Sequence, residues 1–245
     1  MASLHSADLR SGDYHVHSTF SDDAVSTIAE NLAAAAAAGL TTIRLIDHVR
    51  FDTPWVPSFL AAVAAEPVPD GLTVLTGVEA KIMDAAGTLD LPADLVVGPG
   101  GVNAIVIADH QFPGDAGPWS PTTTRENLDA GLPVAAALDL LVDGYIGAMR
   151  GVASGQLAHA FSILPKVGLS EDDLSDEQLG RWAAVVAETG TLVEANEKWA
   201  CPSPRVLQAV VDAGGTLVAA TDSHRASDVG VYNEVAGLLG KVVQV

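Results

Sequence analysis

Short apolar runs alternate with longer amphipathic segments along most of the chain. The apolar runs are rich in Val, Ile, Leu or Thr and predict seven strands, at residues 13–18, 42–48, 72–81, 104–110, 157–161, 191–196 and 216–224. Most of these runs are too continuously apolar for a sheet with one face in water, which is typical of buried parallel strands. We therefore expect a parallel sheet covered by helices.

Helices are predicted between most of these strands, at residues 24–38, 57–65, 125–150, 174–189, 203–213 and 228–239. The third is expected to be two helices, interrupted near residues 131–133, and Ser203-Pro204 has the pattern of an N-cap followed by proline in the first turn. Residues 83–101 are rich in Gly, Pro and Asp and predict a hairpin or a long loop. The repeated alternation favours an α/β barrel or a doubly wound sheet. No composition shift marks a boundary, so we expect one domain over residues 1–245, with its core at about 13–239.

Most of the histidines fall at or near the C-terminal ends of the predicted strands. His15 and His17 are two residues apart on the first strand, so both imidazoles share one face, and Asp222 and His224 have the same spacing on the last strand. The other ligand-type residues in such positions are His48, Glu79, His110 and His159, which leaves His5 outside the set. In a parallel barrel these strand ends converge on one rim, where active sites are built. Residues far apart in the sequence are therefore expected to meet there.

This set of imidazoles and carboxylates is typical of a site for Zn²⁺, Mn²⁺ or iron. It offers more ligands than one ion needs, so we expect two or three divalent ions that share a bridging carboxylate, for which Glu79 is the best candidate. Asp47 and Asp109 each precede a histidine and would point to the opposite face, where they either orient other imidazoles or cap a helix. Glu194 and Asn196 share a face of the sixth strand and have either a structural role or a hydrogen bond to ligands or substrate.

The stretch His15-Val16-His17, followed by Ser-Thr-Phe-Ser-Asp-Asp at residues 18–23, resembles the first motif of the PHP (polymerase and histidinol phosphatase) superfamily. Its later motifs are similar, in the right order, to Asp47-His48, Gly77-Val78-Glu79, His110, Leu157-Ala158-His159 and Thr221-Asp222-Ser223-His224. The resemblance covers roughly residues 13–230. It implies a distorted seven-stranded TIM-like (β/α) barrel, a trinuclear metal site at the C-terminal ends of the strands, and phosphoester hydrolysis.

The resemblance also implies which residues bind the metals: His15, His17, Asp23, His48, Glu79, His110, His159, Asp222 and His224. The ninth ligand of the superfamily, a His or Asp after the first motif, is assigned here to Asp23, with Asp22 as the alternative. Where many relatives have a Gly-Ser-x-His-like motif on the fourth strand, this chain has Ala108-Asp109-His110, which retains the histidine.

Composition and charge narrow the class of partner. The chain has 31 acidic and 12 basic residues and a formal net charge of −19, which argues against binding to a nucleic-acid backbone. One cysteine excludes a disulfide framework and a cysteine-rich zinc fold. We find no signal peptide and no apolar stretch long enough to span a membrane, so a cytoplasmic location is expected. An anionic substrate stays compatible with this charge, because bound metal ions are absent from the count.

These features predict a metal-dependent phosphoesterase that favours small phosphate monoesters, with histidinol phosphate as the first candidate implied by the resemblance. The ions would lower the pKa of a bridging water, and the resulting hydroxide would attack phosphorus while Asp222 and His224 exchange protons as catalytic residues. No organic cofactor is expected. Arg225 and Lys198 are the expected phosphate contacts, and loops on the same rim carry three tryptophans: Trp55, Trp119 and Trp199.

Three alternatives remain open at this point. The first is a nucleotide phosphatase or phosphodiesterase of the same superfamily. The second is an amidohydrolase-type C–N hydrolase, which also opens with two histidines on a strand but usually needs a metal-bridging lysine, and Lys81 is not obviously placed for that. The third, a metal-bound module without turnover, is disfavoured by the complete ligand set. The sequence does not indicate an oligomeric state.

Overall fold

Seven parallel strands form the core of the computed structural model, which describes residues 9–242. Neighbouring strands pair in the order β1 (Gly12–Val16), β2 (Thr42–His48), β3 (Thr73–Lys81), β4 (Ala104–Ala108), β7 (Gly155–Leu157), β8 (Leu192–Asn196) and β9 (Thr216–Ala220). The first and last strands meet again through a parallel bridge between Val16 and Ser223, so the sheet curls into a nearly closed barrel. This arrangement confirms the predicted barrel and excludes the doubly wound sheet. His5 lies outside the described residues.

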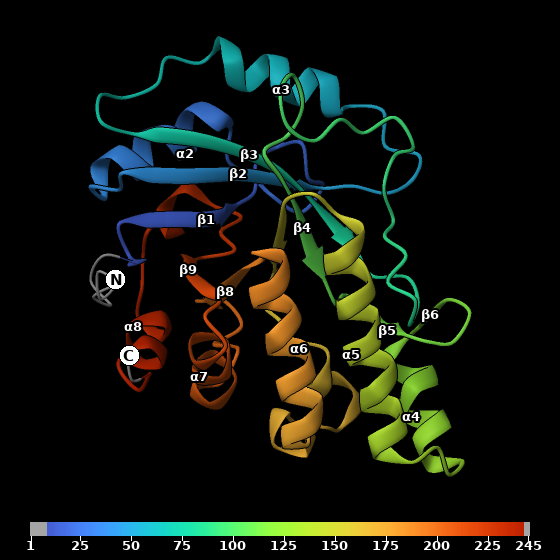
Figure 1. Cartoon of the computed structure of the whole chain (residues 1–245). Helices are drawn as coiled ribbons and strands as arrows, with labels where there is room; N and C mark the ends of the chain where they lie inside the picture. The colour runs from blue at the N-terminus through green and yellow to red at the C-terminus, as the bar shows by residue number, and fades with distance from the viewer. Residues whose placement is uncertain (1–8, 243–245) are drawn as a thin grey trace.

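Helices surround the barrel (Figure 1). They are α2 (Ile28–Ala37), α3 (Val56–Ala65), α4 (Pro121–Asp129), α5 (Val134–Gly151), α6 (Asp176–Thr189), α7 (Pro204–Asp212) and α8 (Glu234–Leu239), with short 3₁₀ helices η1 (Leu164–Val167), η2 (Glu171–Asp173) and η3 (Ala226–Asp228). Figure 1 shows α5 and α6 side by side on one side of the barrel and α3 over β2 and β3. None of the described helices is long and apolar enough to cross a membrane.

Two packed clusters hold the helices against the strands. Ile28 and Leu32 of α2 and Phe59 of α3 pack against Ile43 and Leu45 of β2. The larger cluster joins α5, α6 and α7 to the strands from β3 to β9 and includes several of the largest buried side chains: Phe112, Leu138, Leu141, Tyr145, Phe161 and Trp182. These contacts leave the barrel rigid below the rim on which the candidate residues lie.

The first helix starts later than the alanine-rich pattern predicts. Helix α2 begins at Ile28, because Thr27 and Glu30 form a capping box in which the Thr27 side chain accepts a hydrogen bond from the Glu30 N–H and the Glu30 carboxylate accepts one from the Thr27 N–H. Residues 22–26 therefore stay outside the helix. Asp23 does not cap α2 and lies in the loop between β1 and α2.

The strands also end earlier than predicted. Strand β4 ends at Ala108, β7 at Leu157 and β9 at Ala220, before His110, His159 and Asp222 are reached. The two-residue spacing along a strand therefore does not explain how Asp222 and His224 meet. Asp222 has a φ of 52° and His159 a φ of 30°, so the backbone turns sharply just after these strands. The long segment predicted as a hairpin or loop, residues 83–101, is mostly irregular, and a short hairpin that the sequence did not predict follows β4: β5 (Phe112–Pro113) and β6 (Pro118–Trp119).

Candidate metal centre

The ligand-type residues from across the sequence converge at the C-terminal end of the barrel. His15 belongs to β1, His48 ends β2 and Glu79 belongs to β3, while the others lie on the loops that follow β1, β4, β7 and β9. A cavity of about 400 Å³ opens among them and is lined by Asp22, Asp23, His48, Glu79, His110, His159, Asp222 and His224, among other residues. His15 and His17 lie buried beneath it.

Glu79 lies in the middle of this group. Its two carboxylate oxygens are 2.9–3.4 Å from nitrogen atoms of five imidazoles: His15, His17, His48, His110 and His159. Oε1 lies beside His110 and His159, and Oε2 lies beside the other three, so each oxygen contacts a different set of imidazole rings. This is the geometry expected of a carboxylate that bridges two cations.

Three groups of side chains each place three ligand atoms within 4.8 Å of one another. The deepest consists of His15, His17 and Asp222, all buried, with the two Nε2 atoms 2.9 Å apart and Asp222 Oδ1 3.3 Å from His17 Nε2. The other two groups are His48, Glu79 and His110, and His17, His48 and His224.

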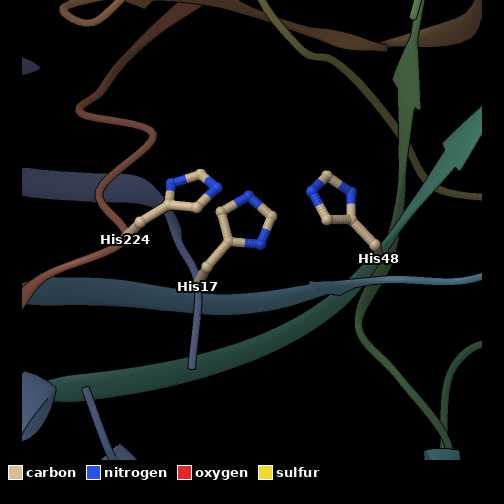
Figure 2. Close-up of side chains that lie close together, drawn as sticks. All are labelled: His17, His48 and His224. Atoms are coloured by element: carbon tan, nitrogen blue, oxygen red, sulfur yellow. The ribbon is translucent and has the colours of Figure 1, made fainter. Parts of the chain in front are cut away.

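The third group joins the buried His17 to the partly exposed His48 and His224. Figure 2 shows the rings of His17, His48 and His224 gathered together, with His17 between the other two. The centroid of the His17 ring is 4.5 Å from that of His48 and 4.3 Å from that of His224. Asp23 Oδ2 lies 3.1 Å from His224 Nε2 and 3.6 Å from His48 Nε2. Asp22 lines the same cavity but has no ion pair with a histidine in the described part of the chain.

Buried acceptors hold the far side of two rings. Glu194 Oε1 lies 2.8 Å from His15 Nδ1, and the Ser162 hydroxyl lies 3.0 Å from His159 Nδ1 and donates to Asp109 Oδ1 at 2.8 Å. A carboxylate beside Nδ1 keeps a proton there, which leaves Nε2 of His15 as the nitrogen that a cation could bind. Asp109 thus lies beside an imidazole other than that of its neighbour in sequence, one of the two options left open for it.

Asp47 has a similar position below His17. Its carboxylate accepts hydrogen bonds from the Ser18 N–H at 2.9 Å and the Ser18 hydroxyl at 2.6 Å, and it lies 3.9 Å from His17 Nδ1. The Ser21 hydroxyl is 3.1 Å from the same nitrogen. The loop after β1 is therefore hydrogen-bonded to the end of β2, and these contacts fix the position of the His17 ring.

The ionisation of the group reflects its mixture of charges. Burial would lower the pKa of His15, but the charges of Glu194, Glu79 and Asp222 outweigh it and raise that pKa well above its ordinary value. Burial would raise the pKa of Glu79 and of Asp222, yet the surrounding imidazoles hold both pKa values below the ordinary range. The buried carboxylates are thus stabilised by positive charge at this place.

The donor set fits divalent cations. Oε2 of Glu79 is buried and receives no hydrogen bond, although three imidazole nitrogens surround it. A buried carboxylate oxygen without a hydrogen-bond donor is costly unless a cation balances it. Imidazole nitrogen and carboxylate oxygen are the ligands preferred by Zn²⁺, Mn²⁺ and iron, and the clusters could bind such ions.

The two expected phosphate contacts have different positions. Lys198 lines the cavity, with Nζ 3.5 Å from Asp222 Oδ2 and 3.3 Å from His224 Nδ1. Arg225 lines a neighbouring cavity of about 610 Å³ that Lys198 also borders. Sequence reasoning missed Arg50, which lines the main cavity. Its only sequence signal is its place just after the His48 strand.

Lys81 also borders the main cavity but belongs to none of the three ligand groups. Its Nζ lies 3.7 Å from Asp90 Oδ2. Glu79, two residues earlier on β3, lies instead among the histidines.

Of the three tryptophans, Trp199 lies at the cavity. Its Nε1–H donates to Asp222 Oδ2 at 2.7 Å, and Lys166 Nζ lies 4.2 Å from the centre of its ring. Trp55 packs on Phe20 and Phe59, and Trp119 stacks on Phe112. The indole of Trp199 therefore both holds one oxygen of Asp222 and forms part of the wall.

Comparison with known proteins places the chain in a family. The family model for the PHP domain matches residues 13–198. A probable phosphatase of Photobacterium profundum is 23% identical over 233 residues, which cover 94% of this chain and 85% of that protein. A probable phosphatase of Caldanaerobacter subterraneus is 39% identical over 83 residues, about a third of each chain.

A solved structure has the same fold. The histidinol phosphate phosphatase of Lactococcus lactis, crystallised with zinc, L-histidinol and phosphate, superposes with a TM-score of 0.59 at 15% identity, over 94% of this chain and 92% of that one. Its barrel agrees with the seven-stranded architecture described above. With a family model that matches most of its length, the chain belongs to the PHP domain family.

Proposed function

We propose that the protein is a metal-dependent phosphoesterase that hydrolyses small phosphate monoesters, with histidinol phosphate as the first substrate to test. The observation that carries the proposal is the position of Glu79, whose two oxygens face five imidazoles at the C-terminal end of the barrel. The names of the relatives and the ligands of the structural neighbour support the same class of reaction.

The cluster would hold two or three divalent ions, with Glu79 as the bridge and Asp23 as a further ligand. Such ions supply Lewis acidity for the phosphoryl group and lower the pKa of water. Asp222 would keep one oxygen, Oδ1, toward His15 and His17, while Trp199 holds the other. We assign proton exchange with the substrate to Asp222 and His224.

The walls of the cavity suit a small anion. Lys198 is the proposed phosphate contact, because its ammonium group lies beside Asp222 and His224 at the cavity wall. Arg225 would contact only a substrate that extends into the neighbouring cavity. Trp199 offers an apolar face to the organic part of the ester.

The test combines metal analysis with a panel of phosphate monoesters, phosphodiesters and amides. We expect purified protein to contain two or three zinc, manganese or iron ions per chain and to release phosphate from monoesters. His15→Ala should reduce kcat/KM by a factor of 10² or more, and so should His110→Ala, at a partly exposed position. Losses of this size are typical when a metal ligand or a residue that orients one is removed. Lys198→Ala should raise KM.

Glu188→Gln is the matched control, since Glu188 pairs with Arg150 on the exposed surface, and it should keep full activity. Folded, metal-loaded protein that cleaves diesters or amides but no monoester would overturn the substrate class. Folded protein that binds no metal and cleaves no ester would overturn the proposal as a whole.

A further inference from the structure

A buried polar chain crosses the barrel directly beneath the candidate metal centre. It consists of Arg44 on β2, Gln156 on β7 and Glu194 on β8, and all three side chains are less than a tenth exposed. One Nη1 hydrogen of Arg44 is donated to Gln156 Oε1. The amide of Gln156 donates to Glu194 Oε1 at 2.6 Å and to the Tyr14 carbonyl at 2.8 Å. The chain therefore leads from an arginine on one wall to the acceptor of His15.

The chemistry of arginine gives this chain a direction. A guanidinium only donates hydrogen bonds, so the Gln156 oxygen must face Arg44 and the Gln156 amide hydrogens must face Glu194 and Tyr14. Glu194 Oε1 then acts as an acceptor toward His15 Nδ1, at 2.8 Å. Because a carboxylate oxygen cannot donate, the His15 ring must carry a proton on Nδ1, which leaves Nε2 as the nitrogen that a cation could bind.

Glu194 is fixed by further donors on its other oxygen. Oε2 accepts hydrogen bonds from the His159 N–H at 3.1 Å and from Asn196 Nδ2 at 2.8 Å. The same carboxylate thus contacts the backbone of one candidate ligand and the side chain of another. Only its bond to Gln156 connects it to Arg44, whose guanidinium supplies positive charge to the interior.

The buried polar chain of Arg44, Gln156 and Glu194 is not explained by a contribution to stability alone. Nε of Arg44 is buried without a hydrogen-bond partner. Buried charged groups are often replaced by apolar side chains of similar volume with no loss, or with a gain, of stability. An arginine that keeps an unsatisfied buried donor therefore points to a role beyond packing.

We propose that Arg44 and Gln156 are positioning residues, which act through Glu194 to hold His15 with its Nε2 lone pair toward the metal centre. The proposal rests on the metal centre of the proposed function and extends it to residues that touch neither metal nor substrate. In this scheme, the arginine orients the glutamine amide, the amide orients the carboxylate, and the carboxylate selects the tautomer of the imidazole.

The test compares zinc affinity with the stability of the metal-free protein. Arg44→Met and Gln156→Glu should weaken one zinc-binding step by roughly 10–100-fold, measured by competition with a chromophoric chelator. The melting temperature of metal-free Arg44→Met should stay within a few degrees of the wild-type value. ¹⁵N NMR of histidine in the zinc-loaded wild type should show a His15 proton on Nδ1, and that signal should be lost or mixed with the other tautomer in Gln156→Glu.

Gln178→Glu is the matched control, because Gln178 is also a buried glutamine but caps α6 far from the metal centre. It should lower the melting temperature and leave zinc affinity unchanged. Unchanged zinc affinity in folded Arg44→Met and Gln156→Glu would overturn the inference, and so would a loss of affinity matched by an equal loss of metal-free stability. Wild-type protein that binds zinc but hydrolyses no ester would overturn only the proposed function, whereas wild-type protein that binds no zinc would overturn both.

Discussion

Three residues near the metal centre adopt backbone conformations that L-amino acids rarely take. His159, Phe161 and Asp222 have φ values of 30°, 68° and 52°. Each such residue costs on the order of 1–3 kcal/mol and persists only where its surroundings hold it. Near His159 the support is visible, since the Phe161 N–H donates to the Tyr145 hydroxyl at 2.9 Å and the Ile163 N–H to Asp109 at 3.1 Å. The ligand positions are thus defined by loops that the interior of the protein holds in place.

Tyr145→Phe tests this support. The substitution leaves the Phe161 N–H buried without its acceptor, so the free energy of unfolding should fall by about 1–3 kcal/mol. Urea denaturation followed by circular dichroism measures this change, and an unchanged m-value shows that the two-state transition is preserved. An unchanged midpoint would mean that the strained loop does not depend on the tyrosine.

The sequence predicted that these residues converge but not the conformation of their backbone. Leu157-Ala158-His159-Ala160-Phe161 alternates in a way that is typical of a strand, yet the strand ends at Leu157. The positive φ values depend on acceptors from α5 and from the loop after β4, more than ten residues away in sequence. No local pattern carries that information. The start of α2, by contrast, follows from a local pattern. The capping box of Thr27 and Glu30 is visible in the sequence, and it would have placed the helix start after Asp23.

At the scale of elements, helix α7 shows how one segment completes another. Ser203 is at the N-cap as predicted, but its side chain makes no capping bond. The Ser203 N–H donates instead to the carboxylate of Glu171 in η2 at 2.7 Å, and Arg205 donates to the Glu171 carbonyl. The N-terminus of α7 is therefore already paired with a carboxylate from the chain itself. Only the tertiary structure determines that Glu171 lies at this helix N-terminus.

Glu171 gives this junction a pH dependence. Burial raises the pKa of Glu171, with the charges of Asp172 and Asp109 adding to the effect, although bonds from Ser203 partly oppose it. The folded state then binds the Glu171 proton more tightly than the unfolded state does. The contribution of Glu171 to wild-type stability is therefore present at low pH, and it is lost as the pH rises through the raised pKa. Glu171→Gln keeps an acceptor for Ser203 and removes this loss.

The expected result is a difference that grows with pH. The free energy of unfolding of Glu171→Gln, relative to that of wild type, should increase between about pH 4 and pH 7.5, because the ordinary glutamate pKa lies near the lower limit. Urea titrations of both proteins at a series of pH values measure it. A difference that stays constant or shrinks with rising pH would show that the carboxylate is not destabilised by its burial.

At the scale of the whole molecule, the barrel gathers many buried ionisable side chains at one place. Seven carboxylates are buried in or around the centre: Asp13, Asp47, Glu79, Asp90, Asp109, Glu194 and Asp222. The alternation of strands and helices predicted either a barrel or a doubly wound sheet, and the resemblance to the PHP superfamily selected the barrel. Of these carboxylates, only Glu79 and Asp222 were predicted to converge with the histidines. Residues such as Arg44 and Gln156 could not be predicted as partners, since nothing in a single sequence shows which side chains face each other across a barrel.

Removal of metal should therefore destabilise the whole protein. Under the proposed function, bound ions balance the buried carboxylates, and a ligand present at 100 to 1,000 times its Kd stabilises the folded state by about 2.7–4.1 kcal/mol. We expect a chelator to lower the melting temperature by several degrees and added zinc or manganese to restore it. The chelator saturated with zinc before its addition is the control. A melting temperature that stays unchanged on metal removal would indicate that protons alone, and not metal ions, balance the charge of the buried carboxylates.

The bridge between Val16 and Ser223 has a consequence for the order in which the molecule is made. Around it, the Asp13 carboxylate binds the N–H and hydroxyl of Thr221, 208 residues away in sequence. Contacts of such separation carry a large loop-closure entropy and favour late formation during folding. A nascent chain emerging from the ribosome carries His15 and Glu79 long before Asp222 and His224 are synthesised. Completion of the ligand set thus coincides with closure of the barrel, and any shorter translation product ending before β9 holds an open and incomplete site.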